Sequence, residues 1–445
     1  MKKFMLFALL FTFTTCKQKS NSSNADDKAK TSFIKTHGTR FEIDNKPYYF
    51  MGANFWEGMN LGAVTASGNR ERLKRELDRM QKIGITNLRI MGITEGPDTE
   101  PFRIVPSNND KGVLKEEYLV GLDYLLSEMA KRNMYAVICT NNFWPWSGGM
   151  AQYLVWAKEL KKIAYPMGNT PKGSWSNYQN ETAKFYNSDI AMNMYKKSLE
   201  QLIKRKNTIT ELPYAEDPTI MSWELCNEPR GINNIKNYLR WIEKTAAFIK
   251  SLDTNHLVTV GSEGITGEPG FSGVPFEATH LSKNIDYTCA HIWIQNWGWY
   301  DPKKHNETYP EASKKALAYL KYHVEISKKM NKPFVLEEFG IMKDNGDYDF
   351  KASNVHRDIY YDLMFGQIYQ YAKENAACGV NFWAWGGEGR AREVGCWWKA
   401  GDDFLGDPPH EEQGWYSVYD TDSTTHKVIK KYADLLKGSS HMAKK

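Results

Sequence analysis

Apolar residues recur along this chain with two periods, one typical of helices and one typical of short buried strands. Helical spacing predicts helices at 70–82, 116–132, 188–206, 232–252, 311–330, 354–377 and 424–436. Short apolar runs predict strands at 49–56, 85–91, 134–140, 218–225, 256–261, 285–293, 334–338 and 379–385. These strands are mostly apolar rather than strictly alternating, as expected for parallel strands that are covered on both faces.

The order of these elements predicts the fold class. About eight strands alternate with helices, so we predict an α/β fold, a (β/α)8 TIM barrel in one domain over residues 34–437. A hairpin at 39–50, with its turn at Asp44 and Asn45, is expected before the first barrel strand. An open doubly wound sheet is the alternative, and it is disfavoured because no glycine-rich phosphate loop follows an early strand.

Three connections in this pattern are long, at 141–187, 261–284 and 386–422, and the segment 263–284 has no clear helix. Each connection follows the C-terminal end of a predicted strand, so we expect all three on one face of the barrel, where they would build a cleft. Their aromatic residues would serve the core or form platforms for sugar rings. They are Trp144, Trp146, Tyr153, Trp175, Tyr178, Trp397, Trp398 and Trp415.

The N-terminus has the pattern of a targeting segment. Lys2 and Lys3 precede a short apolar run at 4–13, and a small residue then precedes Cys16, which resembles a bacterial lipoprotein processing site. We expect a signal peptide at 1–16, a flexible tether at 17–33 and a disordered tail at 438–445. The protein is then exported and held by a lipid anchor in the periplasm or at the cell surface. An ordinary cleaved signal, and thus a secreted protein, is the alternative.

Composition narrows the possible partners. The 445 residues carry a net charge of +5 without a long Lys/Arg block, so we expect no nucleic-acid partner. The six cysteines lack the spacing of a zinc site and suggest no disulfide. Asp402, Asp403 and Asp407 lack the spacing of an EF-hand. We expect no metal, no cofactor and a monomer.

Two strands end on glutamates. The run 221–230 stops at Asn227-Glu228-Pro229, and the run 334–340 offers Glu338. A (β/α)8 barrel has its active site at these strand ends, and two carboxylates there suffice for glycoside hydrolysis. The configuration is retained when they lie about 5–5.5 Å apart and inverted at about 6.5–9.5 Å. Other polar or aromatic residues that end strands are Asn54, Arg89, Asn141, His291 and Trp383.

These segments resemble family 5 of the glycoside hydrolases of clan A, and specifically its β-mannanase subfamily. The resemblance covers most of residues 34–437. Its motifs are Leu88–Ile90, Thr140–Trp144, Gly148–Tyr153, Trp223–Arg230, His291–Trp293, Leu336–Gly340, Asn381–Gly387 and Ala400–Pro409. A lone Asn-Glu-Pro would be weak evidence, whereas this ordered set is specific.

The resemblance implies a role for each carboxylate and for its neighbours. Glu228 would be the acid/base, with a raised pKa, and Glu338 the nucleophile. Arg89 would keep Glu338 ionised and oriented. Asn227 would bind the 2-hydroxyl of the substrate, and His291 would order the hydrogen-bond network.

The remaining implied residues bind the sugars. Trp383 would lie under the reacting sugar, Arg230 would reach a sugar on the leaving-group side, and Asn141 and Trp144 belong to the matching motifs. Many family members have a tyrosine where this chain has Trp293, whose indole N–H would have to replace the phenolic hydrogen bond to the nucleophile.

The pair Glu337-Glu338 is ambiguous from the residues alone, because adjacent strand residues point to opposite faces. Only one of them is expected to face the barrel mouth. The family pattern selects Glu338, so we expect Glu337 to be structural.

The function that follows is a retaining, endo-acting β-1,4-mannanase that acts on β-mannan or manno-oligosaccharides. An exo-acting mannosidase or mannobiohydrolase, or a related β-glucan hydrolase, is the alternative. A non-catalytic glycan-binding lipoprotein is the third hypothesis, and it would be expected to lack a carboxylate.

Overall fold

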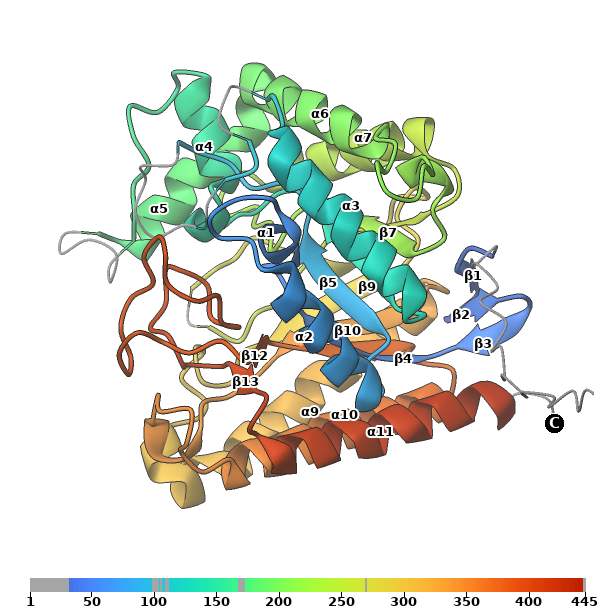
Figure 1. Ribbon diagram of the computed structural model, residues 1–445, viewed down its shortest axis with the longest axis vertical. Coiled ribbons are helices and arrows are strands. Elements are labelled where there is room, and N and C mark those ends of the chain that lie inside the picture. The colour runs from blue at the N-terminus through green and yellow to red at the C-terminus, as the bar shows by residue number, and fades with distance from the viewer. Residues whose placement is uncertain are drawn as a thin grey trace, which may run out of the picture.

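Eight parallel strands form the centre of the computed structural model, in the order β8-β7-β6-β5-β4-β11-β10-β9 (Figure 1). Strands β8 and β9, at the two ends of this order, are linked by the hydrogen bond from the Asp286 N–H to the Val258 carbonyl, at 2.8 Å. The predicted barrel is thus present and nearly closed. Its strands are β4 (Phe50–Asn54), β5 (Asn87–Met91), β6 (Tyr135–Cys139), β7 (Ile220–Glu224), β8 (Leu257–Thr259), β9 (Thr288–Ile292), β10 (Phe334–Phe339) and β11 (Gly379–Phe382).

The structure describes residues 32–97, 104, 106–108, 112–166, 173–268 and 270–442. The predicted signal peptide, with Cys16, and all but the last two residues of the predicted tether lie outside these ranges. Within them, no helix has both the length and the apolar character needed to cross a bilayer. The cysteines in these ranges are all free thiols.

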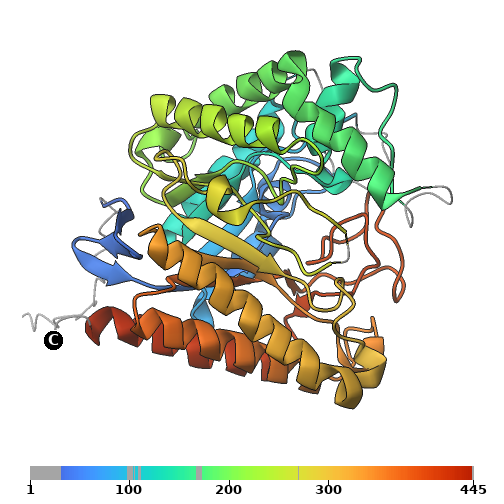
Figure 2. The ribbon, with the colours of Figure 1, turned by 180° about the vertical axis from the view of Figure 1, so that it is seen from behind.

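Helices surround the barrel on its outer face (Figures 1 and 2). Those that follow strands and cover the barrel are α2 (Arg70–Lys82), α3 (Glu116–Lys131), α6 (Asp189–Ile203), α7 (Ile235–Leu252), α9 (His305–Lys329), α10 (Val355–Lys373) and α11 (Ser423–Met442). Shorter helices lie in the loops: α1 (Gly58–Gly62), α4 (Gly149–Trp156), α5 (Trp175–Thr182), α8 (Phe276–Thr279), η1 (Pro145–Ser147), η2 (Ala183–Asn187), η3 (Tyr214–Glu216), η4 (Pro302–Lys304) and η5 (Asp344–Gly346).

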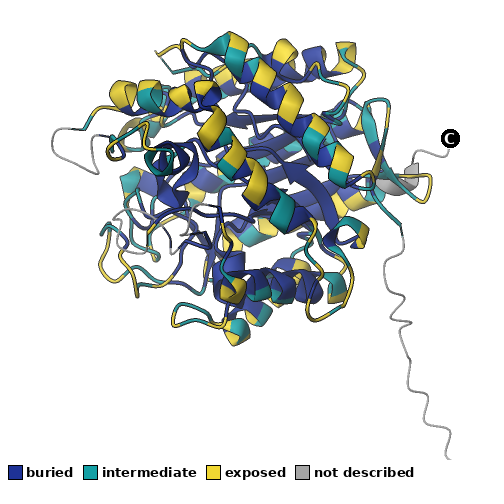
Figure 3. Ribbon diagram, turned by 90° about the horizontal axis from the view of Figure 1, so that it is seen from above, coloured by how far each residue is buried: buried dark blue, intermediate teal, exposed yellow. Residues whose placement is uncertain are grey.

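Local sequence accounts for these boundaries. The side chain of Asn69 accepts the Arg72 N–H at 2.9 Å and starts α2. Ser188, the predicted N-cap of α6, accepts the Ala191 N–H at 3.0 Å. All residues of the barrel strands are buried except Tyr135, which is half-buried at the start of β6, while the helices bury one face and expose the other (Figure 3).

The N-terminal hairpin forms as predicted, from β2 (Arg40–Ile43) and β3 (Lys46–Tyr48). Asp44 and Asn45 make its turn with positive φ angles, as a two-residue hairpin turn requires. A third strand, β1 (Lys35–His37), pairs with β2.

Two helices are longer than predicted. Helix α9 begins at His305, six residues before the predicted start at 311, and includes Pro310, which cannot donate a backbone hydrogen bond. Helix α11 continues to Met442, so the prediction of a disordered tail from 438 is wrong for most of that segment. Ser439 donates to the Leu435 carbonyl at 3.1 Å, within the last turns of this helix.

The long loops gather at the C-terminal ends of the strands, as predicted. Two short paired strands, β12 (Trp385–Gly387) and β13 (Val418–Tyr419), hold the base of the loop at 388–417. In Figures 1 and 2 this loop, drawn in red, lies beside α5 of the loop after β6. Segments more than two hundred residues apart in the sequence therefore meet above the barrel.

Candidate active site

Glu228 lies just beyond β7, in a tight turn. Its backbone has a φ of 51°, a left-handed conformation that costs a non-glycine residue about 1–3 kcal/mol. The Glu228 N–H donates to the Gly261 carbonyl at 2.8 Å, and the Asn227 N–H donates to the Asn141 carbonyl at 2.9 Å. These bonds to the neighbouring loops hold the turn and aim the carboxylate of Glu228 above the barrel.

Glu338 lies in β10, and Arg89 of β5 binds it from within the barrel. The guanidinium of Arg89 also binds both carboxylate oxygens of Glu224, at 2.6 and 2.7 Å, and the side chains of Asn54 and Asn227, at 3.0 and 2.8 Å. Arg89 thus connects strands β4, β5 and β7 to Glu338 in β10. Glu224 was not among the predicted site residues, because nothing in its local pattern distinguishes it from a buried strand residue.

His291 of β9 joins the two predicted catalytic glutamates. Its Nδ1 lies 2.7 Å from Oε1 of Glu228 and 3.4 Å from Oε2 of Glu338. One oxygen of each carboxylate and one imidazole nitrogen all lie within 4.8 Å of one another. The two carboxylates, predicted as a pair from separate strands, do meet.

Two indoles complete the surroundings of Glu228. The Trp144 N–H donates to its Oε2, and the Trp293 N–H donates to its Oε1 at 3.3 Å. The expectation that Trp293 serves Glu338 is therefore wrong, since its N–H reaches Glu228 instead. Trp293 packs at 5.0 Å against Tyr416, whose hydroxyl donates to Asn296.

This environment reverses the expected protonation of the pair. Burial alone would raise the pKa of Glu228, but the hydrogen bond and charge of His291, with Arg230 and Trp144, lower that pKa to about 2. Burial raises the pKa of Glu338 to about 8, against the opposing charges of His291 and Arg89. Both directions are opposite to those expected, because His291, Arg230 and Trp144 stabilise the carboxylate of Glu228 while the charge of Glu228 opposes ionisation of Glu338.

Strand β10 departs from regular alternation at its two glutamates. Leu336 pairs with Ala290 and Glu338 pairs with His291, so Glu337 is an extra residue, as in a β-bulge. Both glutamates consequently contact His291, Glu338 at Nδ1 and Glu337 at Nε2, which lies 3.8 Å from Oε2 of Glu337. The regular alternation on which the prediction was based is thus broken at Glu337. Of the two glutamates, only Glu338 lines the cavity at the barrel mouth, and Glu337 is buried behind His291.

A cavity of about 510 Å³ opens over the two carboxylates. Seven predicted site residues line it, namely Trp144, Asn227, Glu228, Arg230, Trp293, Glu338 and Trp383. Its other walls come from the loops: Trp146, Trp175, Gln179, Glu263, Glu268, Asn296, Trp297, Trp397, Pro408, His410, Glu411, Glu412, Trp415 and Tyr416. The aromatic residues Tyr153, Tyr178 and Trp398 are buried in the core instead.

Three predicted residues lie behind the cavity wall. Arg89 and His291 are buried and act on the glutamates from below. Asn141 is buried as well, and it positions Asn227 through its backbone carbonyl. Trp383 reaches the cavity between Trp146 and Trp293, with ring centroids at 6.3 and 6.1 Å.

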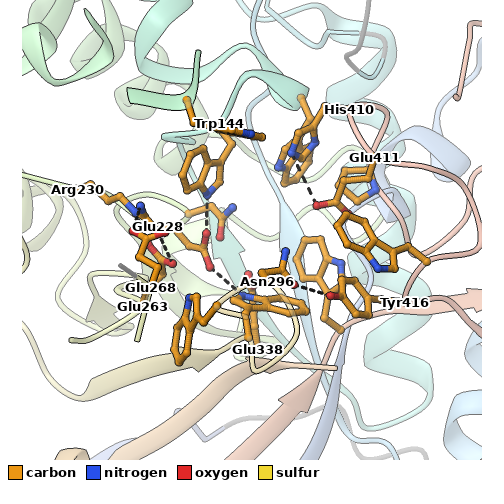
Figure 4. Close-up of a pocket in the computed structure, with 18 of the residues that line it drawn as sticks. Trp144, Glu228, Arg230, Glu263, Glu268, Asn296, Glu338, His410, Glu411 and Tyr416 are labelled. Atoms are coloured by element: carbon orange, nitrogen blue, oxygen red, sulfur yellow. Dashed lines mark hydrogen bonds and ion pairs between the residues drawn. The ribbon is translucent and has the colours of Figure 1, made fainter. Parts of the chain in front are cut away.

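One side of the cavity is charged (Figure 4). Arg230, drawn beside Glu263 and Glu268, binds Glu263 at 2.6 and 2.8 Å and Gln179 at 2.9 Å, and it also pairs with Glu268. Its guanidinium lies 4.9 Å from the ring of Trp144. The two acidic partners of Arg230 were not predicted, because they come from a loop without a local motif.

The opposite side comes from the loop at 388–417, with His410, Glu411 and Tyr416 (Figure 4). Burial raises the pKa of Glu411 well above its usual range, and its Oε2 has no hydrogen-bond partner among the described residues. The ring of His410 contacts Trp175 at 6.2 Å edge to face. This contact joins the loops after β6 and β12 over the cavity.

The group formed by Glu228, His291 and Glu338 also has donor atoms that suit a divalent cation. Arg89 and His291 already supply positive charge there, since each contacts Glu338. A further cation would compete with the guanidinium for the same carboxylate. We therefore assign this group to acid–base and nucleophilic chemistry.

Known proteins resemble this chain over nearly its whole length. Residues 31–441 match the family model described as GH family 5 beta-mannosidase-like. Mannan endo-1,4-beta-mannosidase 5 of Arabidopsis thaliana is 30% identical over 89% of this chain and 86% of its own. A glycoside hydrolase family 5 mannosidase of Rhizomucor miehei, solved with mannosyl-fructose, is 37% identical, with a TM-score of 0.85 over 93% of this chain and 99% of that chain. The endo-1,4-beta-mannanase of the same organism shares the fold, at 21% identity and a TM-score of 0.65 over 92% of this chain and 100% of that chain.

Proposed function

Because the chain belongs to glycoside hydrolase family 5, in its β-mannosidase-like group, we propose that it hydrolyses β-1,4-mannosidic bonds by double displacement. Glu338 attacks the anomeric carbon, and Glu228 first protonates the leaving oxygen and then activates water. Asn227 binds the 2-hydroxyl and Trp383 lies under the reacting sugar. The observation that carries the proposal is the meeting of the two carboxylates in one cavity.

Their spacing supports retention of configuration. One oxygen of Glu228, one of Glu338 and a nitrogen of His291 lie within 4.8 Å of one another. Inverting enzymes hold their carboxyl groups about 6.5–9.5 Å apart, so that a water molecule fits between carboxylate and sugar. The closer spacing favours direct attack by Glu338 over activation of such a water.

The resting site has to move one proton before it can react. Between the low pKa of Glu228, about 2, and the raised pKa of Glu338, about 8, the proton lies on Glu338. Reaction needs it on Glu228. Nδ1 of His291 can give its proton to Glu228 and accept the proton of Glu338. The charge of His291 is then the same before and after the transfer.

We propose further that the enzyme acts on the ends of chains and on short β-mannosides. The contact between Trp175 and His410, which joins two loops over the cavity, supports a cleft blocked at one end, whereas internal attack on a polymer needs a cleft open at both ends. Glu411, half-buried in the cavity wall and with a pKa that burial raises well above its usual range, is our candidate donor to a hydroxyl of the terminal sugar. The mannosidase solved with mannosyl-fructose is also a closer relative than the endo-mannanase of the same organism.

Endo action is the second candidate, favoured by the Arabidopsis relative. A time course with mannohexaose separates the two. Release of a single short product from the first minutes onward supports exo action, and an early mixture of intermediate lengths supports endo action. Parallel assays on mannan, galactomannan, glucomannan and cellulose test the substrate class, and activity on cellulose alone would overturn it.

We also propose, from the N-terminal pattern at 1–16, that the chain is exported and lipid-anchored. Labelling of cells with a radioactive fatty acid tests this, with Cys16→Ser as the control. Incorporation into the wild-type chain but not into the variant supports the anchor, whereas a soluble, unlabelled wild-type chain contradicts it.

A further inference from the structure

His291 is buried between two pairs of acidic residues, one pair from β7 and one from β10. One of these four acids, Glu337, has no assigned role in the proposed reaction. The charged groups that face it from the neighbouring strands are Glu224 and Glu228 from β7, Glu337 and Glu338 from β10, and Arg89 from β5 beyond Glu338. On its own strand, Cys289 contributes a thiol close to Glu337. Glu337 is the acid without an assigned role.

The side chain of Glu337 is set inside the barrel by the bulge in β10. It is 1% exposed, and its Oε1 accepts the hydroxyl of Tyr287 at 3.2 Å, which lies 2.9 Å from the hydroxyl of Ser222. A regular strand would point Glu337 away from the interior, because Glu338 already faces it. The bulge therefore places a second carboxylate behind the imidazole.

The remaining atoms of Glu337 and His291 point at each other. Neither Oε2 of Glu337 nor Nε2 of His291 has a hydrogen-bond partner among the described residues, and the two atoms are 3.8 Å apart. Burial of an unpaired carboxylate or imidazolium is costly, and an ion pair between them offsets much of that cost. A carboxylate at this position favours the charged form of His291.

We infer that Glu337 is a positioning residue that keeps His291 an imidazolium throughout the reaction, so that its Nδ1–H can face whichever of Glu228 and Glu338 is ionised. The inference rests on the proposed double displacement. Before attack Glu338 is the anion, and after glycosylation Glu228 is the anion. Nδ1 lies within 2.7 and 3.4 Å of these two carboxylates, so a small rotation serves both states.

The electrostatics of the site agree with this geometry. Burial alone would lower the pKa of His291, but the charge of Glu338, the hydrogen bond to Glu228 and the nearby carboxylate of Glu337 raise that pKa to about 10. The pKa of Glu337 is held below its ordinary value, against burial, by His291 and Arg89. Glu337 thus stays ionised where its charge is needed.

The test is a titration of the histidine side chains of the whole chain, labelled with ¹⁵N and followed by NMR without substrate. The chain has 10 histidines, and the signal of His291 is the one lost in His291→Gln. In the wild type it should remain that of an imidazolium at pH 7 and above. In Glu337→Gln its titration midpoint should fall by about 1–3 pH units, and Glu337→Asp should restore most of the shift.

Asp123→Asn is the matched control, because Asp123 is another buried carboxylate that accepts a tyrosine hydroxyl, that of Tyr214 at 2.6 Å, away from His291. It should leave the His291 titration unchanged. An equal midpoint in Glu337→Gln and wild type would reduce Glu337 to a structural residue. A neutral His291 in the wild type at pH 7 would overturn the inference even if Glu337→Gln does not fold.

The second state, after glycosylation of Glu338, can be tested in the same way. The enzyme is trapped as the glycosyl intermediate with an activated 2-deoxy-2-fluoro-β-mannoside. His291 should again be an imidazolium, and a neutral ring there would refute its constant charge. Because the first titration uses no substrate, a chain that fails to cleave any β-mannoside would refute the proposed function without changing the result for Glu337.

Discussion

Replacement of Arg89 by lysine tests whether the guanidinium or only its charge supports the predicted nucleophile. Arg89 makes five side-chain hydrogen bonds, to Glu224, Asn54, Asn227 and Glu338. Lysine has at most three donors, so at least two bonds are lost, each worth about 1.5–3 kcal/mol when it involves a charged group. We expect Arg89→Lys to lower the free energy of unfolding by about 3–5 kcal/mol, as for other broken buried ion pairs.

The same change should slow the reaction beyond what unfolding explains. Without the rigid fork, Arg89 no longer connects the carboxylate of Glu338 to Asn54 and Glu224. A displacement of about 1 Å in a reacting group costs about 100-fold in rate. We therefore expect kcat/KM on a β-mannoside to fall by about 100-fold under conditions where calorimetry shows the variant folded.

Arg205→Lys provides the control. Arg205 is also an arginine between two acids, Asp123 and Glu116, but it lies on the outer side of the barrel, between α3 and the chain after α6. We expect it to lose stability while its kcat/KM stays near that of the wild type. Equal kcat/KM in Arg89→Lys and Arg205→Lys would refute the assigned role of the guanidinium.

Further predictions concern the acid, the pH dependence, metal and the loop contact. Glu228→Gln should lower kcat on manno-oligosaccharides by about 100-fold or more. The variant should keep the first step on an aryl β-mannoside with an acidic leaving group, which is seen as a burst of released phenol. Equal losses on both substrates would argue against a general acid. Glu228 and Glu338 share one proton, which is lost as pH rises through the pKa of Glu338, about 8. We therefore expect kcat/KM to fall as pH rises through about 8. Activity that persists to about pH 10 would contradict this. EDTA should leave kcat unchanged, since Arg89 and His291 supply the positive charge at Glu338, and an inactivation that a divalent metal reverses would refute this. Trp175→Ala with His410→Ala should open the closed side of the cavity and shift the products of mannohexaose toward intermediate lengths, and an unchanged product pattern would show that other residues close it.

The barrel could be predicted from the sequence because its signals are local. Each strand is a short apolar run and each covering helix has an apolar face, so the periods of the pattern give the order of the elements directly. Glu228 was found for the same reason, since it ends such a run, whereas the choice of Glu338 over Glu337 came from the family pattern. The bounds of α9 and α11 were missed where weak helix formers, Pro310 and the glycine and serines after Lys437, lie in segments that are nonetheless helical.

The walls of the cavity could not be predicted in this way. Glu263, His410 and Glu411 come from long loops, and no spacing in those loops tells which side chains turn inward. Their positions depend on contacts between distant segments, such as that between Trp175 and His410. Glu224 was missed for the opposite reason: it lies within a regular strand, and only the three-dimensional position of Arg89 reveals its use.

The errors at the centre of the site share one physical origin. Alternation along β10 and the expected protonation of Glu228 and Glu338 were both argued for one residue at a time. In the folded protein, the bulge at Glu337 brings a further carboxylate to His291, and His291 in turn decides which of Glu228 and Glu338 holds the proton. The ionisation of Glu228 and Glu338 therefore depends on His291 and Glu337 as well, and the four residues titrate together. A substitution at Glu337, which need not touch the sugar, should therefore change the pH dependence of the enzyme more than its affinity for substrate.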